Sequence, residues 1–566
     1  MSNHFIFFFR DSDSIVCFYD ISVFSEVDRS ELIEILGITE IDYSIKASNE
    51  KIVSSKPELK SQHISSAESI LKRLNIQTEF LRLCRVYSNE TIDFDQLLEC
   101  VYTLDEYVDS YTKMNYFLSE SGESDSDNRE VDLSSTVIDI NSDNLLACFD
   151  KDELEYYRKL FNKLSRNPTY TEYFDILQSN SEHARHWFFN GNYFYKNKFT
   201  KTKVKDDCRN DTLMKMIKST LYNIDRYTVR VNSLVAFKDN SSVIKGRDTV
   251  YFTALSSNNY YFLSRTLNPV LTAETHNFPT LISPFHGAHT GVGGRIRDNQ
   301  ATGIGAIVLS SLAGYCVGDV HTELNQKKNG DDEIDDYGDY PTPLDILIKA
   351  SNGASDYGNK FGEPIIGGFT RSFSTKNILD ANNNSVERVE WMKPIMFSAG
   401  LGAITERNTF KQEAQVNMLV VRIGGPAYKI GLGGGYASSL DQNNDSQKSD
   451  ALAVQRGDPE MCTKMNNVLR YLMDVNKENI IVSIHDQGSG GLGNVVKEIV
   501  HPYGAVVKLD NVTLGDNTMA GWEIWCAEFQ ESNVMLINKR DINEVKYICK
   551  RENIHCDVIG EILDQN

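Results

Sequence analysis

Two short segments place histidine beside charged groups at spacings that suit acid–base chemistry. In the first, residues 180–186 read Asn-Ser-Glu-His-Ala-Arg-His, so His183 and His186 lie three apart on the polar side of an expected helix. With Arg185 between them, two imidazoles and a guanidinium suit proton transfer and phosphate contact. The spacing fits a solvated helix face at least as well, so both interpretations stay open.

The second segment, residues 271–279, reads Leu-Thr-Ala-Glu-Thr-His-Asn-Phe-Pro and favours a strand up to His276. Side chains two apart in a strand share a face, so Glu274 and His276 point the same way. A carboxylate beside an imidazole suits a metal ligand next to a general acid or base. A strand-end pair that only hydrogen-bonds locally is the alternative.

Glycine and arginine gather in the residues that follow. Four glycines fall within residues 287–294, and Arg295, Arg297 and Asp298 come directly after them. Glycine lets a backbone approach a phosphate and expose N–H donors, and a following carboxylate could hold Mg²⁺. The pattern is neither a P-loop nor a dinucleotide-binding fingerprint, and glycine alone also fits flexible turns. We expect a phosphate-binding loop here.

Two later segments join a strand to a glycine run. Residues 480–491 read as an apolar strand that ends in His485 and Asp486, followed by Gly-Ser-Gly-Gly. Residues 416–439 repeat the order of strand and glycines. A carboxylate at a strand tip and a helix N-terminus nearby favour ligand binding, so a phosphate cradle competes with plain turns in the second segment.

Residues 455–460 read Gln-Arg-Gly-Asp-Pro-Glu. Asp458 and Pro459 are typical of a helix N-cap and first helical position, and capping explains both without any chemistry. The apolar residues that follow at helical spacing predict a buried stripe on this helix, formed by Met461, Met465, Val468, Leu469 and Leu472.

The elements that must position these segments divide the chain into five units. The composition and periodicity predict a small α+β domain at 1–118, an acidic disordered linker at 119–145, a helical linker domain at 146–198, an α/β domain at 199–411 and a second at 412–566. The fold class is therefore α/β and α+β, with several domains.

Charge and composition exclude some classes of function. The chain has 58 Lys and Arg against 79 Asp and Glu, a formal charge of −21, so we expect neither nucleic-acid nor membrane binding. No stretch of about 18 apolar residues indicates a membrane span. The ten cysteines form no Cys-x-x-Cys pair, which fits a reducing, cytoplasmic compartment.

From about residue 146 onward, five motifs resemble phosphoribosylformylglycinamidine synthase, the glutamine-dependent enzyme of purine biosynthesis, in its long eukaryotic-like form. They are Asn-Ser-Glu-His-Ala-Arg-His-Trp-Phe-Phe at 180–189, Ala-Glu-Thr-His-Asn-Phe-Pro-Thr at 273–280, Ser-Asn-Gly-Ala-Ser-Asp-Tyr-Gly-Asn-Lys-Phe-Gly-Glu-Pro at 351–364, Arg-Gly-Asp-Pro-Glu-Met at 456–461 and Ser-Ile-His-Asp-Gln-Gly at 483–488. Residues 1–118 match only in position and size.

The resemblance implies a ferredoxin-like N-terminal domain, a helical linker and one A-plus-B module of the aminoimidazole-ribonucleotide-synthetase-like superfamily. The implied enzyme is an ATP-dependent carbon–nitrogen ligase. It converts formylglycinamide ribonucleotide to the amidine through an iminophosphate, with ammonia from glutamine. The implied cofactors are ATP and Mg²⁺. The implied partners are a second copy of the chain or a complementary synthase or glutaminase chain.

The resemblance also assigns roles to single residues. His183 and His276 correspond to catalytic residues, and Glu274, Asp298 and Asp486 to metal ligands. The implied substrate contacts are Thr275, Asn277, Phe278, Arg297, Gln455, Glu528 and Gln530. The implied nucleotide contacts are His186, Gly287, Ala288, His289, Thr290, Gly291, Val292, Gly293, Gly294, Arg295, Ile296, Arg297 and Asp298.

The sequence departs from the family pattern in two ways. Ala184 stands where the family has Cys or Ser, and neither a second module nor a glutaminase is recognised in the 566 residues. A truncated paralogue or fragment that binds a nucleotide or a partner without turnover is therefore the alternative. A shorter ATP-dependent synthetase of the same superfamily is disfavoured, because those chains lack the Asn-Ser-Glu-His segment.

Overall fold

The structure is a computed structural model of the whole chain. It describes residues 5–9, 15–20, 39–40, 51–56, 81–87, 92, 94–95, 98–103, 106, 129–131, 133, 149, 151–180, 189–191, 212–222, 232–254, 260–320, 337, 340–379, 385–438, 452–474, 479–529 and 531–564. No helix within these ranges combines the length and the apolar character that crossing a membrane requires.

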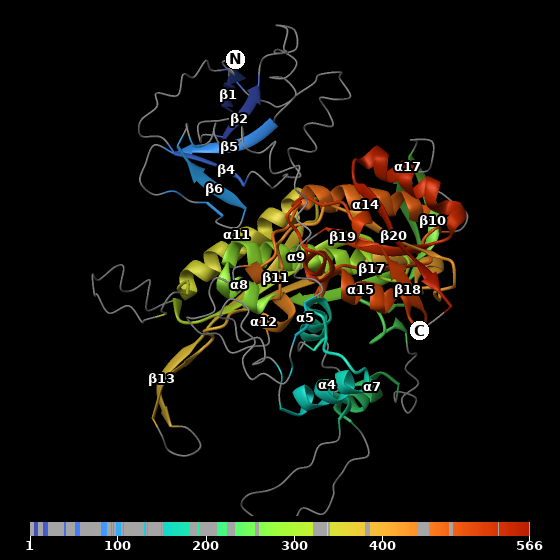
Figure 1. Cartoon of the computed structure of the whole chain (residues 1–566), viewed down its shortest axis with the longest axis horizontal. Helices are drawn as coiled ribbons and strands as arrows, with labels where there is room; N and C mark the ends of the chain where they lie inside the picture. Colours follow the sequence, from blue (N-terminus) through green and yellow to red (C-terminus); the bar gives the residue numbers. More distant parts are fainter. Residues whose placement is uncertain are drawn as a thin grey trace, which may run out of the picture.

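The N-terminal region contains a six-stranded antiparallel sheet, drawn in blue in Figure 1. Its order is β3-β1-β2-β5-β4-β6, with β1 at Phe5–Phe9, β2 at Ile15–Asp20, β3 at Thr39–Glu40, β4 at Lys51–Ser55, β5 at Leu81–Tyr87 and β6 at Glu99–Tyr102. The ferredoxin-like assignment of this region stays a prediction. Asp95, just before β6, accepts hydrogen bonds from the guanidinium of Arg456, with Nε 2.5 Å from its Oδ2.

Among the described residues that follow, helices lie at Lys151–Lys163 (α4), Tyr170–Ser179 (α5) and Leu213–Tyr222 (α7). Helix α5 begins at Tyr170, because Thr169 and Glu172 form a capping box at its start. One face of α5 is apolar and packs against aromatic residues of the C-terminal domain. Phe174 and Trp522 lie 4.9 Å apart between ring centres. This contact fixes α5 beside the C-terminal domain.

The middle domain is built on a seven-stranded sheet in the order β12-β11-β15-β10-β8-β7, with β9 paired to β10. The strands are β7 at Ser233–Val235, β8 at Ser242–Ile244, β9 at Arg247–Ala254, β10 at Tyr260–Thr275, β11 at Ile307–Val317, β12 at Ile365–Ser372 and β15 at Ile395–Thr405. A separate hairpin of β13 (Ser374–Leu379) and β14 (Ser385–Glu390) extends from the domain (Figure 1).

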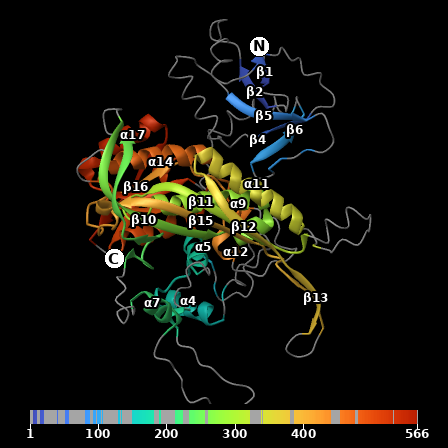
Figure 2. The ribbon, with the colours of Figure 1, turned by 180° about the vertical axis from the view of Figure 1, so that it is seen from behind.

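Helices cover one face of this sheet: α8 at Asn277–Ile282, α9 at Pro284–Gln300 and α11 at Pro343–Phe361. Side chains along β10 and β15 point alternately toward the helices and toward the other face of the sheet. Met396 is fully buried against α9, whereas Leu271 and Leu401, which face each other across the strand pair, are about half exposed. The strands β10, β11 and β15 run side by side in the centre of Figure 2.

The C-terminal domain has a five-stranded sheet in the order β17-β19-β16-β20-β18, covered by helices on both faces. The strands are β16 at Leu419–Gly424, β17 at Ser483–Asp486, β18 at Gly504–Val507, β19 at Ser532–Ile537 and β20 at His555–Leu563. The helices are α12 at Gly434–Ala437, α14 at Pro459–Asp474, α15 at Gly491–Val500, α16 at Gly521–Cys526 and α17 at Ile542–Glu552. Three short 3₁₀ helices lie at Glu406–Asn408, Leu509–Asn511 and Lys539–Asp541.

Helix α14 begins as the sequence predicts. Pro459 is its first residue, and the Asp458 carboxylate accepts a hydrogen bond from the Met461 N–H at 3.0 Å. All five residues of the predicted stripe are buried, and they pack on the same core as α17. Local capping and periodicity were therefore sufficient to predict this helix.

Candidate functional site

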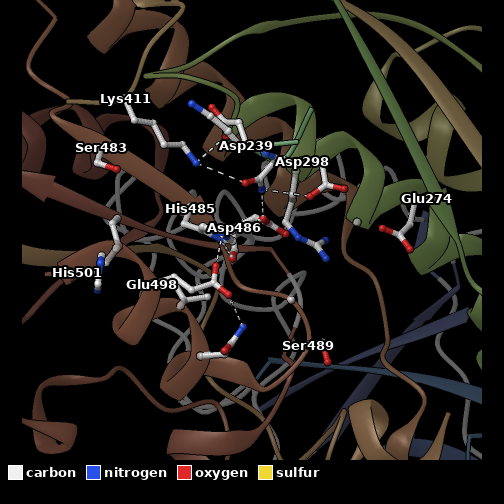
Figure 3. Close-up of a pocket in the computed structure, with 18 of the residues that line it drawn as sticks. Asp239, Glu274, Asp298, Lys411, Ser483, His485, Asp486, Ser489, Glu498 and His501 are labelled. Atoms are coloured by element: carbon white, nitrogen blue, oxygen red, sulfur yellow. Dashed lines mark hydrogen bonds and ion pairs between the residues drawn. The ribbon is translucent and has the colours of Figure 1, made fainter. Parts of the chain in front are cut away.

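A cavity of about 1050 Å³ lies between helix α5, the β10–α9 corner, the 411–414 loop and the β17–α15 corner (Figure 3). The structure brings ten of the residues expected at the site to its wall: Glu274, Thr275, His276, Thr290, Gly294, Arg297, Asp298, Gln455, Asp486 and Glu528. His183, His186 and Gln530 lie outside the described residues, so their roles stay predictions.

Three carboxylates from distant parts of the chain face this cavity. Glu274 is at the end of β10, Asp298 is in the last turn of α9, and Asp486 ends β17. The amide nitrogen of Asn240 lies 3.2 Å from Asp298 Oδ1 and 2.5 Å from Asp486 Oδ1, and donates to both. One amide thus holds two carboxyl groups close together.

The surroundings of these carboxylates disfavour their charged forms. Burial raises the pKa of Glu274 to about 7, and the negative charge of Asp486 adds to the effect. Burial also raises the pKa of Asp298 well above its ordinary range, again with Asp486 contributing. Both residues are partly buried and line the cavity. A cation bound between them would relieve this repulsion.

The donor set fits magnesium better than a metal that needs a complete protein cage. In the described ranges, no three His, Cys, Asp or Glu side chains are arranged to hold an ion. Mg²⁺ is commonly held by one or two carboxylates, with water and substrate phosphates completing the octahedron. Asp298 and Asp486, linked through Asn240, supply such a pair of hard oxygen ligands.

His276 stands where β10 turns into α8 and lines the same cavity as the three carboxylates. Its Nδ1 lies 2.5 Å from the carbonyl oxygen of Gly287. Because a carbonyl only accepts, Nδ1 carries the hydrogen in this contact, and the neutral ring has its lone pair on Nε2. This tautomer suits a general base. The expectation that Glu274 and His276 face the same way agrees with their common position on the cavity wall.

The expected phosphate-binding loop has a different conformation. Residues 287–298 lie inside helix α9, so the backbone N–H groups in its interior are used by the helix and cannot form a phosphate cradle. The glycines serve close packing instead. Gly287 lies against the backbone of α8, and Gly293 lies against the ring of Tyr357. The prediction failed because glycine spacing does not distinguish a loop from a tightly packed helix.

Only four residues of that segment line the cavity: Thr290, Gly294, Arg297 and Asp298. Arg295 is fully buried and donates two hydrogen bonds to Glu363, so its role here is structural. Two expected substrate contacts also lie off the cavity wall. The side-chain oxygen of Asn277 accepts from the Met396 N–H at 3.0 Å, and Phe278 is buried in a small apolar cluster.

The two strand–glycine segments meet at one carboxylate. Gly433 and Gly490 each precede a helix, with φ of 78° and 80°, a backbone conformation that favours glycine. Glu528 Oε1 accepts from the N–H of Gly435 and of Gly490, each at 3.1 Å. The expected phosphate cradle is therefore filled by Glu528. Burial raises the pKa of this carboxyl to about 7.

Sequence reasoning missed a second layer of polar residues around the cavity. Lys411 pairs with Asp239 at 2.8 Å, and Figure 3 shows both near Asp298. His485 Nε2 lies 2.7 Å from Glu498. Burial alone would lower the pKa of His485, but the hydrogen bond with Glu498 keeps it above its ordinary value. Lys411, Asp239 and Glu498 belong to no motif with a fixed spacing, and only the fold brings them to this wall of the cavity.

Two family models match this chain. Residues 139–186 match the formylglycinamide ribonucleotide amidotransferase linker domain, and residues 415–566 match the AIR synthase related protein, C-terminal domain. One relative comes from Arabidopsis thaliana and is named "Probable phosphoribosylformylglycinamidine synthase, chloroplastic/mitochondrial". It is 46% identical to this chain, and the match covers 75% of this chain and 29% of the relative. The resemblance to these synthases is confirmed.

The synthases of Dictyostelium discoideum and Homo sapiens are 45% and 42% identical, each over 73% of this chain and 30% of their own length. The chain therefore spans about a third of the length of these relatives. The family models also confirm the expected fold class, with the exception of the ferredoxin-like N-terminal domain.

The solved structures to which the chain is similar include two of Thermotoga maritima PurL. The structure described as complexed with FGAR is 22% identical, with a TM-score of 0.47, and the match covers 72% of this chain and 52% of that one. The structure described as complexed with ATP is 19% identical, with a TM-score of 0.45, and the match covers 73% of this chain and 51% of that one.

Proposed function

We propose that the chain carries the synthase site of a phosphoribosylformylglycinamidine synthase. At this site ATP would phosphorylate the amide oxygen of formylglycinamide ribonucleotide, and ammonia would displace the phosphate to leave the amidine. The observation that carries the proposal is the position of three carboxylates beside His276 in one cavity, in a chain homologous to these synthases. The chemistry requires such a site because an amide is a poor electrophile until its oxygen becomes a leaving group.

The residues at the cavity have distinct proposed roles. Asp298 and Asp486, with Glu274 nearby, would hold Mg²⁺, which supplies charge stabilisation for the transferring phosphoryl group. His276, with its Nε2 lone pair, would take a proton from the attacking ammonia. Arg297 would contact the substrate and the developing charge. Its Nη1 is held 3.2 Å from Glu531.

Thr275, Gln455 and Glu528 complete the proposed substrate contacts on the described wall of the cavity. For His183, His186 and Gln530 the resemblance alone supports the proposed roles. We infer that glutamine is the source of ammonia, through a glutaminase of the same assembly. The scattered cysteines support a cytoplasmic location, although the Arabidopsis relative is named as chloroplastic/mitochondrial.

The open face of the middle sheet supports the proposed association with a second copy or a complementary chain. Leu271 and Leu401 are 55% and 47% exposed, and Leu312 and Ile366 of the neighbouring strands are 42% and 65% exposed. A contiguous apolar surface of this kind usually marks an interface. Light scattering at micromolar concentration should therefore give more than the mass of one chain, and a monomer would contradict the association.

Turnover with ammonia tests the function directly. The purified chain should form the amidine from formylglycinamide ribonucleotide, ammonia, ATP and Mg²⁺, and His276→Ala should lower that rate by roughly 10²–10⁴-fold. Calorimetry with nucleotide and millimolar Mg²⁺ separates binding from turnover. Binding without turnover would favour the non-catalytic alternative, and the absence of both would reject the proposed function.

A further inference from the structure

Two of the glutamine side chains that line the cavity have buried amide atoms without a hydrogen-bond partner among the described residues. Gln178, in the last turn of α5, is only 2% exposed, and among the described residues neither its amide nitrogen nor its amide oxygen has a hydrogen-bond partner. Gln455 is 7% exposed, and its Oε1 also lacks a partner within the described ranges. Buried polar atoms are nearly always paired, so these three atoms call for an explanation.

The position of Gln178 is fixed by its helix. The same face of α5 buries Tyr173, Phe174 and Leu177 against the C-terminal domain. Lys497 of α15 donates to Asp175 and to Ser179, at 2.9 and 2.8 Å, and so ties the last turn of α5 to α15. The amide therefore cannot reach bulk solvent without disturbing this packing, and it is preorganised in the cavity wall.

The orientation of Gln455 is set by its neighbour. Its Nε2 lies 2.5 Å from Glu528 Oε2, which leaves its oxygen as the unpaired atom. The pair of amides thus offers one donor and two acceptors. A phosphate, which mainly accepts, would meet two carbonyl oxygens here and be repelled. In Figure 3, Ser489 of this wall and the ammonium group of Lys411 lie on opposite sides of Asp486.

We propose that Gln178 and Gln455 form a subsite for the amide portion of the ribonucleotide, a neutral group that both donates and accepts. This inference rests on the function proposed above and extends it with a residue, Gln178, outside the expected site. The carbonyl oxygen of the substrate amide accepts from Gln178 Nε2, and its N–H donates to Gln455 Oε1. A site built in this way discriminates against ligands that lack the group, because its own buried atoms then stay unpaired.

The variant Gln178→Met tests the subsite, since methionine keeps the length and apolar stem of glutamine. Because the Gln178 amide has no partner within the part of the chain that the structure describes, the unfolding temperature without ligand should stay the same or rise. Calorimetry should show binding of formylglycinamide ribonucleotide weakened about tenfold, with Mg²⁺–ATP binding unchanged. Unchanged affinity for the ribonucleotide would overturn the subsite.

Asn479→Leu is the matched control for a structural amide. Asn479 lies off the cavity, donates to the Ile304 carbonyl at 2.7 Å and accepts from the Ile481 N–H at 2.9 Å. This variant should lose thermal stability and keep ribonucleotide affinity. A comparable loss of stability in Gln178→Met would show a structural role for Gln178 and reject the proposal.

Ribose 5-phosphate separates the amide from the sugar as the group that is recognised. It keeps the hydroxyls and phosphate but has no amide, so Gln178→Met should bind it as the wild type does. If Gln178→Met weakened the binding of ribose 5-phosphate as much as that of the ribonucleotide, the two glutamines would contact the ribose hydroxyls, and the amide assignment would be overturned. If the wild type binds neither ribonucleotide nor nucleotide, the proposed function fails. The subsite then fails with it. If the wild type binds both ligands and Gln178→Met keeps the wild-type affinity for the ribonucleotide, the subsite alone is rejected.

Discussion

Two sets of carboxylates in this molecule have different partners. Behind the cavity, Glu363 is held by Arg295 and Asp557 by Arg422, in pairs that are almost fully buried. At the cavity, Asp298 and Asp486 share one neutral amide instead. The first arrangement compensates charge within the fold. The second leaves negative charge that a bound cation can neutralise, which is how a functional site differs from a structural one.

The largest effect should come from breaking a compensated pair. Glu363→Gln would leave the Arg295 guanidinium buried without its counter-charge, so we expect a loss of about 3–5 kcal/mol in the free energy of unfolding. Chemical denaturation measures this. The double variant Arg295→Met with Glu363→Leu removes both charges and should recover most of the loss. If the single and the double variant were equally destabilised, the change in side-chain volume rather than the unpaired charge would explain the loss of stability.

At the cavity, removing a carboxylate should act in the opposite direction on stability. Burial and, after it, repulsion from Asp486 raise the pKa of Asp298. Asp298→Asn removes both costs, so without metal the unfolding midpoint at pH 7.5 should rise. Turnover should fall at least about a hundredfold, because the metal-held charge contributes several kcal/mol. A variant that is less stable in EDTA would contradict the contrast between the two sets.

Asn240 provides a finer test, since it contacts the carboxylates without being charged. Asn240→Ala should lower the affinity for Mg²⁺ by roughly 10–100-fold, the usual effect of losing a group that orients metal ligands. Calorimetric titration with Mg²⁺ and nucleotide measures the change. Asn511→Ala, which removes a surface amide bonded to the Val558 carbonyl, should leave the affinity unchanged. Equal affinity in both variants would remove Asn240 from the site.

The smallest effect concerns Glu528, which is held by amides and helix N-termini rather than by arginine. Its folded pKa of about 7 lies above the ordinary 4.5, so the stability that its protonated form confers is complete below pH 4.5 and is lost as the pH rises to 7. Glu528→Gln should therefore match the wild type below pH 4.5 and exceed it above pH 7, by on the order of 1 kcal/mol. Parallel stability curves from pH 4 to 8 would contradict this.

The sequence was sufficient where a short segment determines its own structure. The Asp458–Pro459 helix start and the strand ending near Glu274 follow from capping and alternation, and both are present. The prediction of a loop at residues 287–298 was wrong, because glycine allows close approach of the backbone both in loops and in tightly packed helices. Only the positions of α8 and Tyr357 show that these glycines belong to a packed helix. Local patterns carry no information about such long-range neighbours.

The same limit explains the rest of the site. Glu528 fills the expected anion cradle from 93 residues away, and Asn240 bridges to Asp486 across 246 residues. Contacts between residues so far apart in the sequence cannot be predicted from motif spacing or composition. Gln178 lies just before a motif that sequence reasoning singled out, but its importance comes from an absent partner, which only a structure can reveal.

The contact between Arg456 and Asp95 has a practical consequence for anyone who shortens this chain. Residues 95 and 456 are 361 positions apart, yet the guanidinium is only 13% exposed and its neighbour Gln455 lines the cavity. A recombinant version that starts after the N-terminal sheet would keep the cavity-lining residues but remove the carboxylate that holds Arg456. The design of such a truncation should therefore include a substitution at residue 456.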